Sequence, residues 1–193
     1  MDRLSKDMRL WRWAFEWAKN ATCDRARHGC IIARDGLVLA EGYNGSVNGE
    51  PHCDEAGHAL TEVQPVRLMT KDEGILTIKK NGGYPYVSQG PSEIHCTRII
   101  HAEQNAILNA AIIGVSIENA SWYITGVPCW RCSKMIARTN PWKIFMCLDR
   151  SPNQEIIKWW YDRIPKQDVV VYPELKDDLV TKGVIDKEWL SWL

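Results

Sequence analysis

One histidine and two cysteines stand at spacings that suit a metal ion. His101 is followed two residues later by Glu103, and Cys129 and Cys132 form a Cys-x-x-Cys pair directly after Pro128. Zinc binds imidazole nitrogen and thiolate sulfur, and catalytic zinc sites use three protein ligands so that a fourth position stays open for water. Zinc lowers the pKa of bound water toward neutrality. The histidine and the two cysteines are therefore predicted as zinc ligands, with Glu103 beside them as general acid and base.

A structural zinc site or a group of buried thiols is the alternative interpretation of the same residues. A structural zinc ion normally has four protein ligands and needs no neighbouring carboxylate. The Cys-x-x-Cys pair alone would be weak support for catalysis. Its combination with His101-x-Glu103 favours a catalytic site.

The composition narrows the classes of protein. The 24 basic and 24 acidic side chains cancel, which argues against a long nucleic acid as partner because neutralised phosphates dominate that affinity. No apolar run approaches the roughly 20 residues that cross a bilayer, and no secretory signal opens the sequence. Seven cysteines in such a chain favour metal binding in a reducing compartment over disulfides. We expect a cytoplasmic protein without a membrane partner.

Hydrophobic periodicity predicts the elements that must position these residues. The predicted elements define an α/β fold of three layers, α/β/α, in which a five-stranded mixed sheet forms the middle layer. Its metal-binding motifs lie at helix starts, where free N–H groups and the helix dipole favour thiolates. In chain order the expected elements are a helix at 7–20, strands at 29–33 and 37–40 joined by Asp35-Gly36, a helix at 101–113, a strand at 121–125, a helix at 129–138, a strand at 143–148, a helix beginning near Ser151 and a strand at 168–172.

We predict a single domain over residues 1–193. Turn-forming residues replace the periodic pattern at about 57–94, where only 75–78 resembles a strand, and this region is expected to be a surface insertion. A mixed appendage is expected at about 174–193.

The segment Tyr43-Asn44-Gly45-Ser46 follows the second strand of the predicted hairpin. Asn-Gly is a common tight turn, and a bare turn is one interpretation. The segment also offers backbone N–H groups and polar side chains at a strand end, where α/β proteins bind ligands. The residue types alone leave both interpretations open.

Several motifs in a fixed order carry a family resemblance. They are Gly42-Tyr43-Asn44-Gly45, Pro51-His52-Cys53, His95-Cys96 and His101-Ala102-Glu103-Gln104-Asn105-Ala106-Ile107, closed by Pro128-Cys129-x-x-Cys132. The His-x-Glu and Pro-Cys-x-x-Cys parts are the signature of zinc-dependent nucleobase deaminases. Over roughly residues 23–148 the chain resembles the deoxycytidylate deaminases of the cytidine deaminase superfamily, including those of phages.

This resemblance implies a cytidine deaminase-like fold and hydrolysis of dCMP to dUMP and ammonia, a step that supplies thymidylate synthesis. It implies a homo-oligomer, a hexamer in many members, with dCTP and dTTP as effectors and Mg²⁺ accompanying an effector nucleotide. For a viral source, the host cytoplasm would be the site of action. The residues implied to bind the substrate nucleotide are Tyr43, Asn44, Gly45, Ser46 and Ala102.

The family often carries a second, structural zinc ion. The matching positions here are Cys23, Cys53 and Cys96, with His95 expected as the fourth ligand. His52 and His58 are alternatives for that place, and a set of buried thiols is the alternative to a second zinc site altogether.

Other functions share the same zinc core. A tRNA adenosine deaminase or a deaminase of cytosine in single-stranded nucleic acid would need a basic, aromatic groove, whereas a non-catalytic zinc-bound scaffold would have no use for Glu103. A deaminase of a riboflavin precursor lacks matching accessory motifs here. The chain also departs from the family pattern: His28-Gly29-Cys30 replaces a usual Val-Gly-Ala run, and Cys147-Leu148 lies where a tyrosine is common. These departures bear on nucleotide preference.

Overall fold

The computed structural model describes residues 3–63, 93–147, 154–165 and 168–172, together with residues 180, 181, 183 and 185. The chain divides into two compact units. The first comprises residues 1–57 and 99–193, and the second comprises residues 58–98.

In the described part of the second unit, β4 (Leu60–Val63) pairs antiparallel with β5 (Glu93–Cys96). It overlaps the insertion predicted at about 57–94. The strand expected at 75–78 lies outside the described residues.

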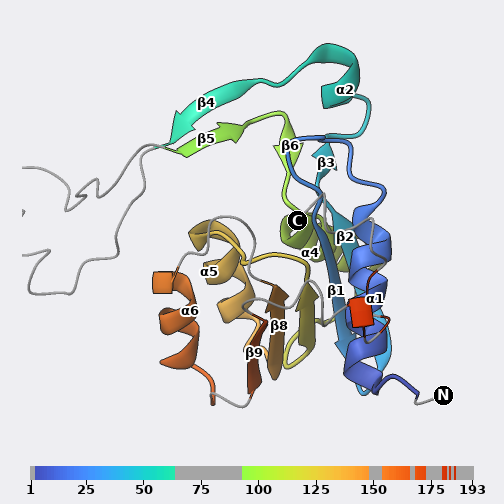
Figure 1. Cartoon of the computed structure of the whole chain (residues 1–193), viewed down its shortest axis with the longest axis vertical. Coiled ribbons are helices and arrows are strands. Elements are labelled where there is room, and N and C mark those ends of the chain that lie inside the picture. The colour runs from blue at the N-terminus through green and yellow to red at the C-terminus, as the bar shows by residue number, and fades with distance from the viewer. Residues whose placement is uncertain are drawn as a thin grey trace, which may run out of the picture. The chain divides into compact units, whose positions relative to one another are not determined.

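The first unit is built on a five-stranded sheet in the order β2-β1-β7-β8-β9 (Figure 1). The sheet is mixed: β1 is antiparallel to both of its neighbours, β2 and β7, whereas β7, β8 and β9 are parallel to one another. The predicted mixed sheet is confirmed. The strands are β1 (Gly29–Arg34), β2 (Leu37–Tyr43), β7 (Ser121–Ile124), β8 (Lys143–Cys147) and β9 (Val169–Tyr172).

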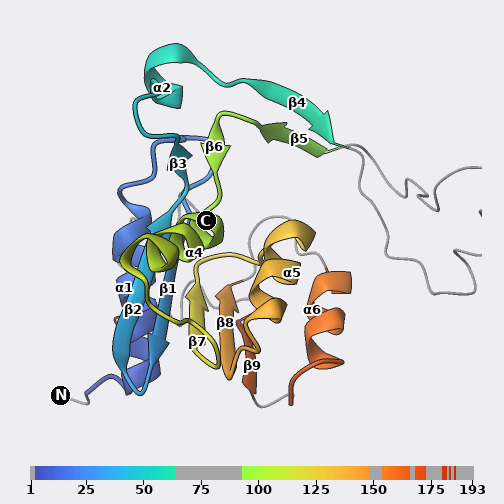
Figure 2. The ribbon, with the colours of Figure 1, turned by 180° about the vertical axis from the view of Figure 1, so that it is seen from behind.

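Helices cover both faces of this sheet (Figure 2). On one face, α1 (Lys6–Ala18) buries Trp11 and Phe15 against Ile31, Tyr123 and Phe145. The opposite face carries the other three long helices. They are α4 (Ala102–Ile113), α5 (Trp130–Arg138) and α6 (Gln154–Tyr161).

The two cores follow from strand geometry. Successive side chains of a strand point to opposite faces, so Ile32, Trp122 and Ile144 join the core beneath α4, α5 and α6, while their neighbours face α1. Ile185, from the predicted C-terminal appendage, is also buried in the core on the α1 face. The predicted α/β/α layering is confirmed. Among the helices formed by described residues, none combines the length and apolar character of a membrane span.

Local signals fix the ends of the elements. Asp35 and Gly36 both have positive φ, 55° and 86°, as a two-residue type I′ hairpin requires. The side chain of Ser5 accepts a hydrogen bond from the Met8 N–H at 3.2 Å and begins α1. Gly114, with φ of 71°, ends α4 in the left-handed conformation that glycine tolerates.

Besides β4 and β5, three short elements of the first unit have no counterpart in the predicted set. The strands β3 (Gly45–Ser46) and β6 (Ile99–Ile100) pair antiparallel, and α2 spans Cys53–Ala56. Elements of two to four residues are too short to show a hydrophobic period. The chain passes from β2 through Asn44 directly into β3, so the tight-turn interpretation of Asn44-Gly45 is wrong.

Two glycines allow helices to lie directly on the sheet. A Cβ at Gly29 would lie 2.0 Å from the Ala14 carbonyl oxygen of α1. A Cβ at Gly42 would lie 2.3 Å from the Ala102 carbonyl oxygen and 2.4 Å from the Ala106 nitrogen. Because both of the latter atoms belong to the backbone of α4, Gly42 sets how closely that helix approaches β2.

We expect Gly42→Ala to lower the free energy of unfolding by about 3 kcal/mol, the upper range for overpacking a rigid contact. Gly49→Ala is the comparison, since a Cβ there meets nothing within 4 Å although φ is 86°; it should cost only about 1 kcal/mol for the left-handed backbone. Urea denaturation followed by circular dichroism measures both variants. Equal losses would contradict this role of Gly42.

Candidate active site

Three predicted ligands converge where two helices begin. The ligand atoms of His101, Cys129 and Cys132 all lie within 4.8 Å of one another. His101 Nδ1 is 3.7 Å from Cys129 Sγ and 3.5 Å from Cys132 Sγ. A tetrahedral zinc ion with bonds of about 2.3 Å to sulfur and about 2.0 Å to nitrogen separates such atoms by roughly 3.6 Å. The donor types and their spacing therefore fit zinc.

The first helical turns hold these ligands in place. His101 is the N-cap of α4, and its N–H donates to the Gln104 side chain at 3.0 Å. Cys129 is the N-cap of α5, and its carbonyl accepts from the Ser133 N–H at 2.8 Å. The buried Ser133 hydroxyl also donates to the Pro128 carbonyl at 3.2 Å. Both metal-binding motifs thus begin a helix, as predicted.

The two thiols differ in acidity. Hydrogen bonds from Cys132 and His101 lower the pKa of Cys129 to about 3. The pKa of Cys132 is raised well above its usual value by its hydrogen bond to Cys129 and by burial, because a second thiolate beside the first is unfavourable. The hydrogen bond to Cys129 likewise raises the pKa of His101. A bound dication removes the repulsion and allows both sulfurs to be thiolates.

Glu103, the second residue of α4, is almost completely buried, with 6% of its surface exposed. Burial raises the pKa of its carboxyl group, and the nearby positive charge of His101 partly offsets that increase. A buried carboxyl group whose pKa is raised is of the kind that general acid–base catalysis uses. The charge of Glu103 also adds to the effect of burial in raising the pKa of Cys30 on β1.

The segment Tyr43–Ser46 is tied to the loop that precedes β1. The Asn44 amide donates to the Ala26 carbonyl at 2.8 Å, and its oxygen accepts from the His28 N–H at 2.6 Å. The Ser46 N–H donates to the Thr22 hydroxyl at 2.9 Å. The Ser46 hydroxyl oxygen is buried and has no hydrogen-bond partner among the described residues. Buried polar atoms are rarely left unpaired, so this hydroxyl is a candidate contact for a ligand.

Other predicted substrate contacts lie nearby in the chain. The Tyr43 ring meets Trp17 edge-on at 6.2 Å between centroids, and its carbonyl accepts from the Asn105 side chain at 2.8 Å. Ala102 is fully buried, with its carbonyl facing Gly42. The nucleotide contacts of these residues stay predictions. The sequence interpretation gave no role to Thr22 or Asn105, although Asn105 lies within the motif at 101–107.

Two of the second set of predicted ligands lie in the first unit. Cys23 follows α1, Cys53 begins α2, and both are buried. The Cys53 N–H donates to the Thr22 carbonyl at 3.2 Å, which brings the two cysteines together.

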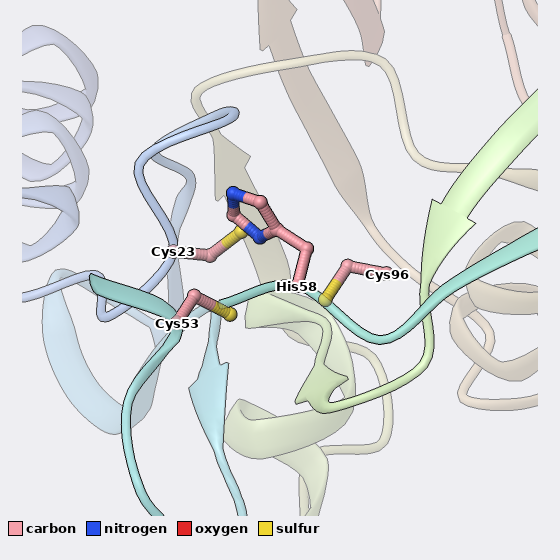
Figure 3. A group of neighbouring side chains, drawn as sticks. All are labelled: Cys23, Cys53, His58 and Cys96. Carbon is pink, nitrogen blue, oxygen red and sulfur yellow. The ribbon is translucent and has the colours of Figure 1, made fainter. Parts of the chain in front are cut away.

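In the second unit, Cys96 of β5 stands opposite Leu60 of β4, two residues after His58. Figure 3 draws the side chains of Cys23 and Cys53, which belong to the first unit, and those of His58 and Cys96, which belong to the second. His52, another of the predicted alternatives, is an exposed helix cap. The His95 side chain lies outside the described residues, so its ligand role stays a prediction.

The fold thus places one histidine and two cysteines, a set that could hold zinc, together at the starts of two helices, with a buried carboxyl group in the first turn of one of them. Residues 4–148 match the family described as "Cytidine and deoxycytidylate deaminase zinc-binding region". The chain belongs to this family, and the predicted resemblance is confirmed.

Individual relatives agree with this assignment. The chain is 33% identical over 140 residues to ComE operon protein 2 of Bacillus subtilis, matching 72% of this chain and spanning 58% of that protein's length. It is 30% identical over 148 residues to deoxycytidylate deaminase of Enterobacteria phage T2, covering 69% of this chain and 75% of that protein. The structure of dCMP deaminase from cyanophage S-TIM5 in complex with dCMP and dUMP has a similar fold, with a TM-score of 0.52, 23% identity, and coverage of 84% of this chain and 91% of that chain.

We expect Cys132→Ala to lower the zinc content by one ion per chain, because only two ligands would remain in the group. Cys147→Ala is the matched control, since Cys147 is a buried cysteine on β8 that lies outside the candidate ligand groups found among the described residues. Elemental analysis after dialysis measures both. Unchanged zinc in the Cys132 variant would contradict its role as a ligand.

Proposed function

We propose that the chain is a zinc-dependent deoxycytidylate deaminase, which hydrolyses dCMP to dUMP and ammonia and so supplies thymidylate synthesis. The observation that carries the proposal is the grouping of His101, Cys129 and Cys132 next to the buried Glu103. The name of the phage T2 relative and the nucleotides bound by the cyanophage enzyme support dCMP as substrate.

The proposed chemistry uses one carboxyl group twice. Zinc, when bound, makes a water molecule acidic enough to react near neutral pH. Glu103 takes a proton from the water that attacks C4 of cytosine and delivers it to N3. It then takes the proton of the hydroxyl group now on C4 and passes it to the amino group. The C4–N bond breaks as the C4 carbonyl forms, and the amino group leaves as ammonia. Burial helps, because a carboxyl group with a raised pKa exchanges protons in both directions.

The substrate nucleotide is proposed to lie against the segment Tyr43–Ser46 and the start of α4 at Ala102. The unpaired Ser46 hydroxyl supports this position, since a sugar hydroxyl or phosphate oxygen would supply the missing partner. The side-chain oxygen of Asn44 and one of its N–H groups are already hydrogen-bonded to the loop at 26–28. It therefore shapes the segment as well as offering its remaining N–H.

Assembly and regulation belong to the same proposal. We infer a cytoplasmic homo-oligomer, with dCTP and dTTP as effectors and Mg²⁺ accompanying an effector nucleotide, from the family resemblance. The outer face of α4 supports a subunit contact, because Leu108 and Ile112, one helical turn apart, are 48% and 81% exposed. Large apolar side chains grouped on one surface commonly mark protein contacts.

From the family resemblance, a second, structural zinc is proposed with Cys23, Cys53 and Cys96 as ligands and a histidine, His95 or one of its alternatives, as the fourth. Three thiolates and an imidazole form a complete tetrahedral set, which is typical of structural zinc. This second group has no buried carboxylate assigned to it, unlike the group with Glu103.

Glu103→Gln should retain zinc and the fold but lower the rate of ammonia release from dCMP by roughly a hundred- to ten-thousand-fold, the usual contribution of a general acid–base group. Glutamine has a similar shape but cannot carry the proton. Wild-type turnover in this variant would refute the mechanism.

The same assay offers dCMP, CMP, dCTP and deoxycytidine to the wild-type protein, and dCMP is expected to react fastest. Release from none of the four would contradict the proposed function and favour a nucleic-acid deaminase or a scaffold.

The wild-type chain should contain two zinc ions, and Cys53→Ala should contain one, because the second group would lose a ligand. Elemental analysis measures the content, with Cys147→Ala again as control. One zinc ion per wild-type chain would remove the second site and leave the proposed catalytic site intact.

A further inference from the structure

The helix that carries His101 and Glu103 is attached to the edge of the sheet by two equivalent hydrogen bonds. The Asn105 amide nitrogen donates to the Tyr43 carbonyl at 2.8 Å, and the Asn109 amide nitrogen donates to the Glu41 carbonyl at 2.8 Å. The acceptors belong to β2, which is an edge strand. Its outward carbonyls would otherwise lack partners in the sheet.

Both hydrogen bonds can form because four residues of a helix and two residues of a strand span nearly the same length. Residues four apart on a helix are separated by about 6 Å along its axis, and residues two apart on a strand by roughly 6.8 Å. Asn105 and Asn109 therefore reach Tyr43 and Glu41 in turn, with α4 running opposite to β2. Gly42 lies between the two acceptors and lets the helix backbone approach.

The two bonds differ in what they hold. Asn105 is in the same helical turn as the proposed catalytic residues, and its N–H donates to the His101 carbonyl at 2.9 Å. Its side chain donates a hydrogen bond to the carbonyl of Tyr43, the first residue of the segment Tyr43–Ser46. Asn109 lies one helical turn further from the site, and its side chain donates a hydrogen bond to the carbonyl of Glu41 within β2.

The segment Tyr43–Ser46 is otherwise tied to other parts of the chain. Asn44 bonds Ala26 and His28, and Ser46 bonds Thr22. These contacts connect the segment to the loop before β1. Gly45 and Ser46 also pair with Ile100 and Ile99 of β6, directly before His101, and the Asn105 bond connects Tyr43 to the helix that carries Glu103.

We propose that Asn105 is a positioning residue: its amide fixes the backbone of Tyr43 and so sets the distance between the nucleotide-binding segment and Glu103. This inference rests on the proposed deaminase function. Without the bond the segment still holds a nucleotide, but the cytosine ring sits out of line with the carboxyl group that exchanges its protons. Small displacements of this kind are costly, about a hundredfold in rate per ångström.

The test compares Asn105→Ala with Asn109→Ala, because each removes one amide-to-carbonyl bond of the same length from the same helix–strand contact. Zinc content, melting temperature, kcat and KM for dCMP are measured for both variants and the wild type. Both should retain zinc and show similar small falls in melting temperature. Asn105→Ala should lower kcat at least about tenfold with a smaller change in KM, whereas Asn109→Ala should keep kcat within about twofold.

Each other outcome decides the matter. Equal kcat values in the two variants would overturn the positioning role. A much larger fall in melting temperature for Asn105→Ala, or failure of that variant to fold, would make Asn105 a structural residue and overturn it as well. Absence of ammonia release from dCMP by the wild-type protein would instead reject the proposed function itself.

Discussion

Two sulfur atoms and one imidazole nitrogen surround a position sized for a single ion, and most of the molecule serves to keep them there. The separations of 3.5 and 3.7 Å between His101 Nδ1 and the two sulfurs are those of neighbouring ligands on zinc. Without a cation, Cys129 and Cys132 shift in opposite directions in pKa, because the pair holds a single negative charge. A dication satisfies both thiolates at once. The fold must therefore bring two helix starts 28 residues apart in sequence to one place.

The sheet accomplishes this by supporting both helices from the same face. α5 begins shortly after β7, so its first turn lies beyond the carboxyl end of that strand, where α/β proteins usually place their sites. α4 is held against β2 over Gly42, and Glu103 in its first turn is buried. Burial in turn raises the pKa of the carboxyl group and gives it the proton affinity that acid–base chemistry requires.

The structural features that could be predicted from the sequence are those that depend on residues close together in the chain. Helix periodicity placed His101 and Cys129 at helix starts, and Asp35-Gly36 gave the hairpin, because caps and turns depend on a few neighbouring residues. The contacts of Asn44 with Ala26 and His28, and of Asn105 with Tyr43, span 16 to 62 residues and leave no periodic trace. Strands of two residues were invisible for the same reason. Choosing His58, His95 or His52 for the second ligand group likewise depended on tertiary structure.

The most direct test of the central claim is a crystal structure of the zinc-loaded protein with anomalous data collected at the zinc absorption edge. We expect a zinc peak within bonding distance of His101 Nδ1 and of the Cys129 and Cys132 sulfurs, with its fourth position left to solvent and the Glu103 carboxyl group facing that position. A fourth side chain bound to this ion, or a Glu103 carboxyl group turned away from it, would contradict the account.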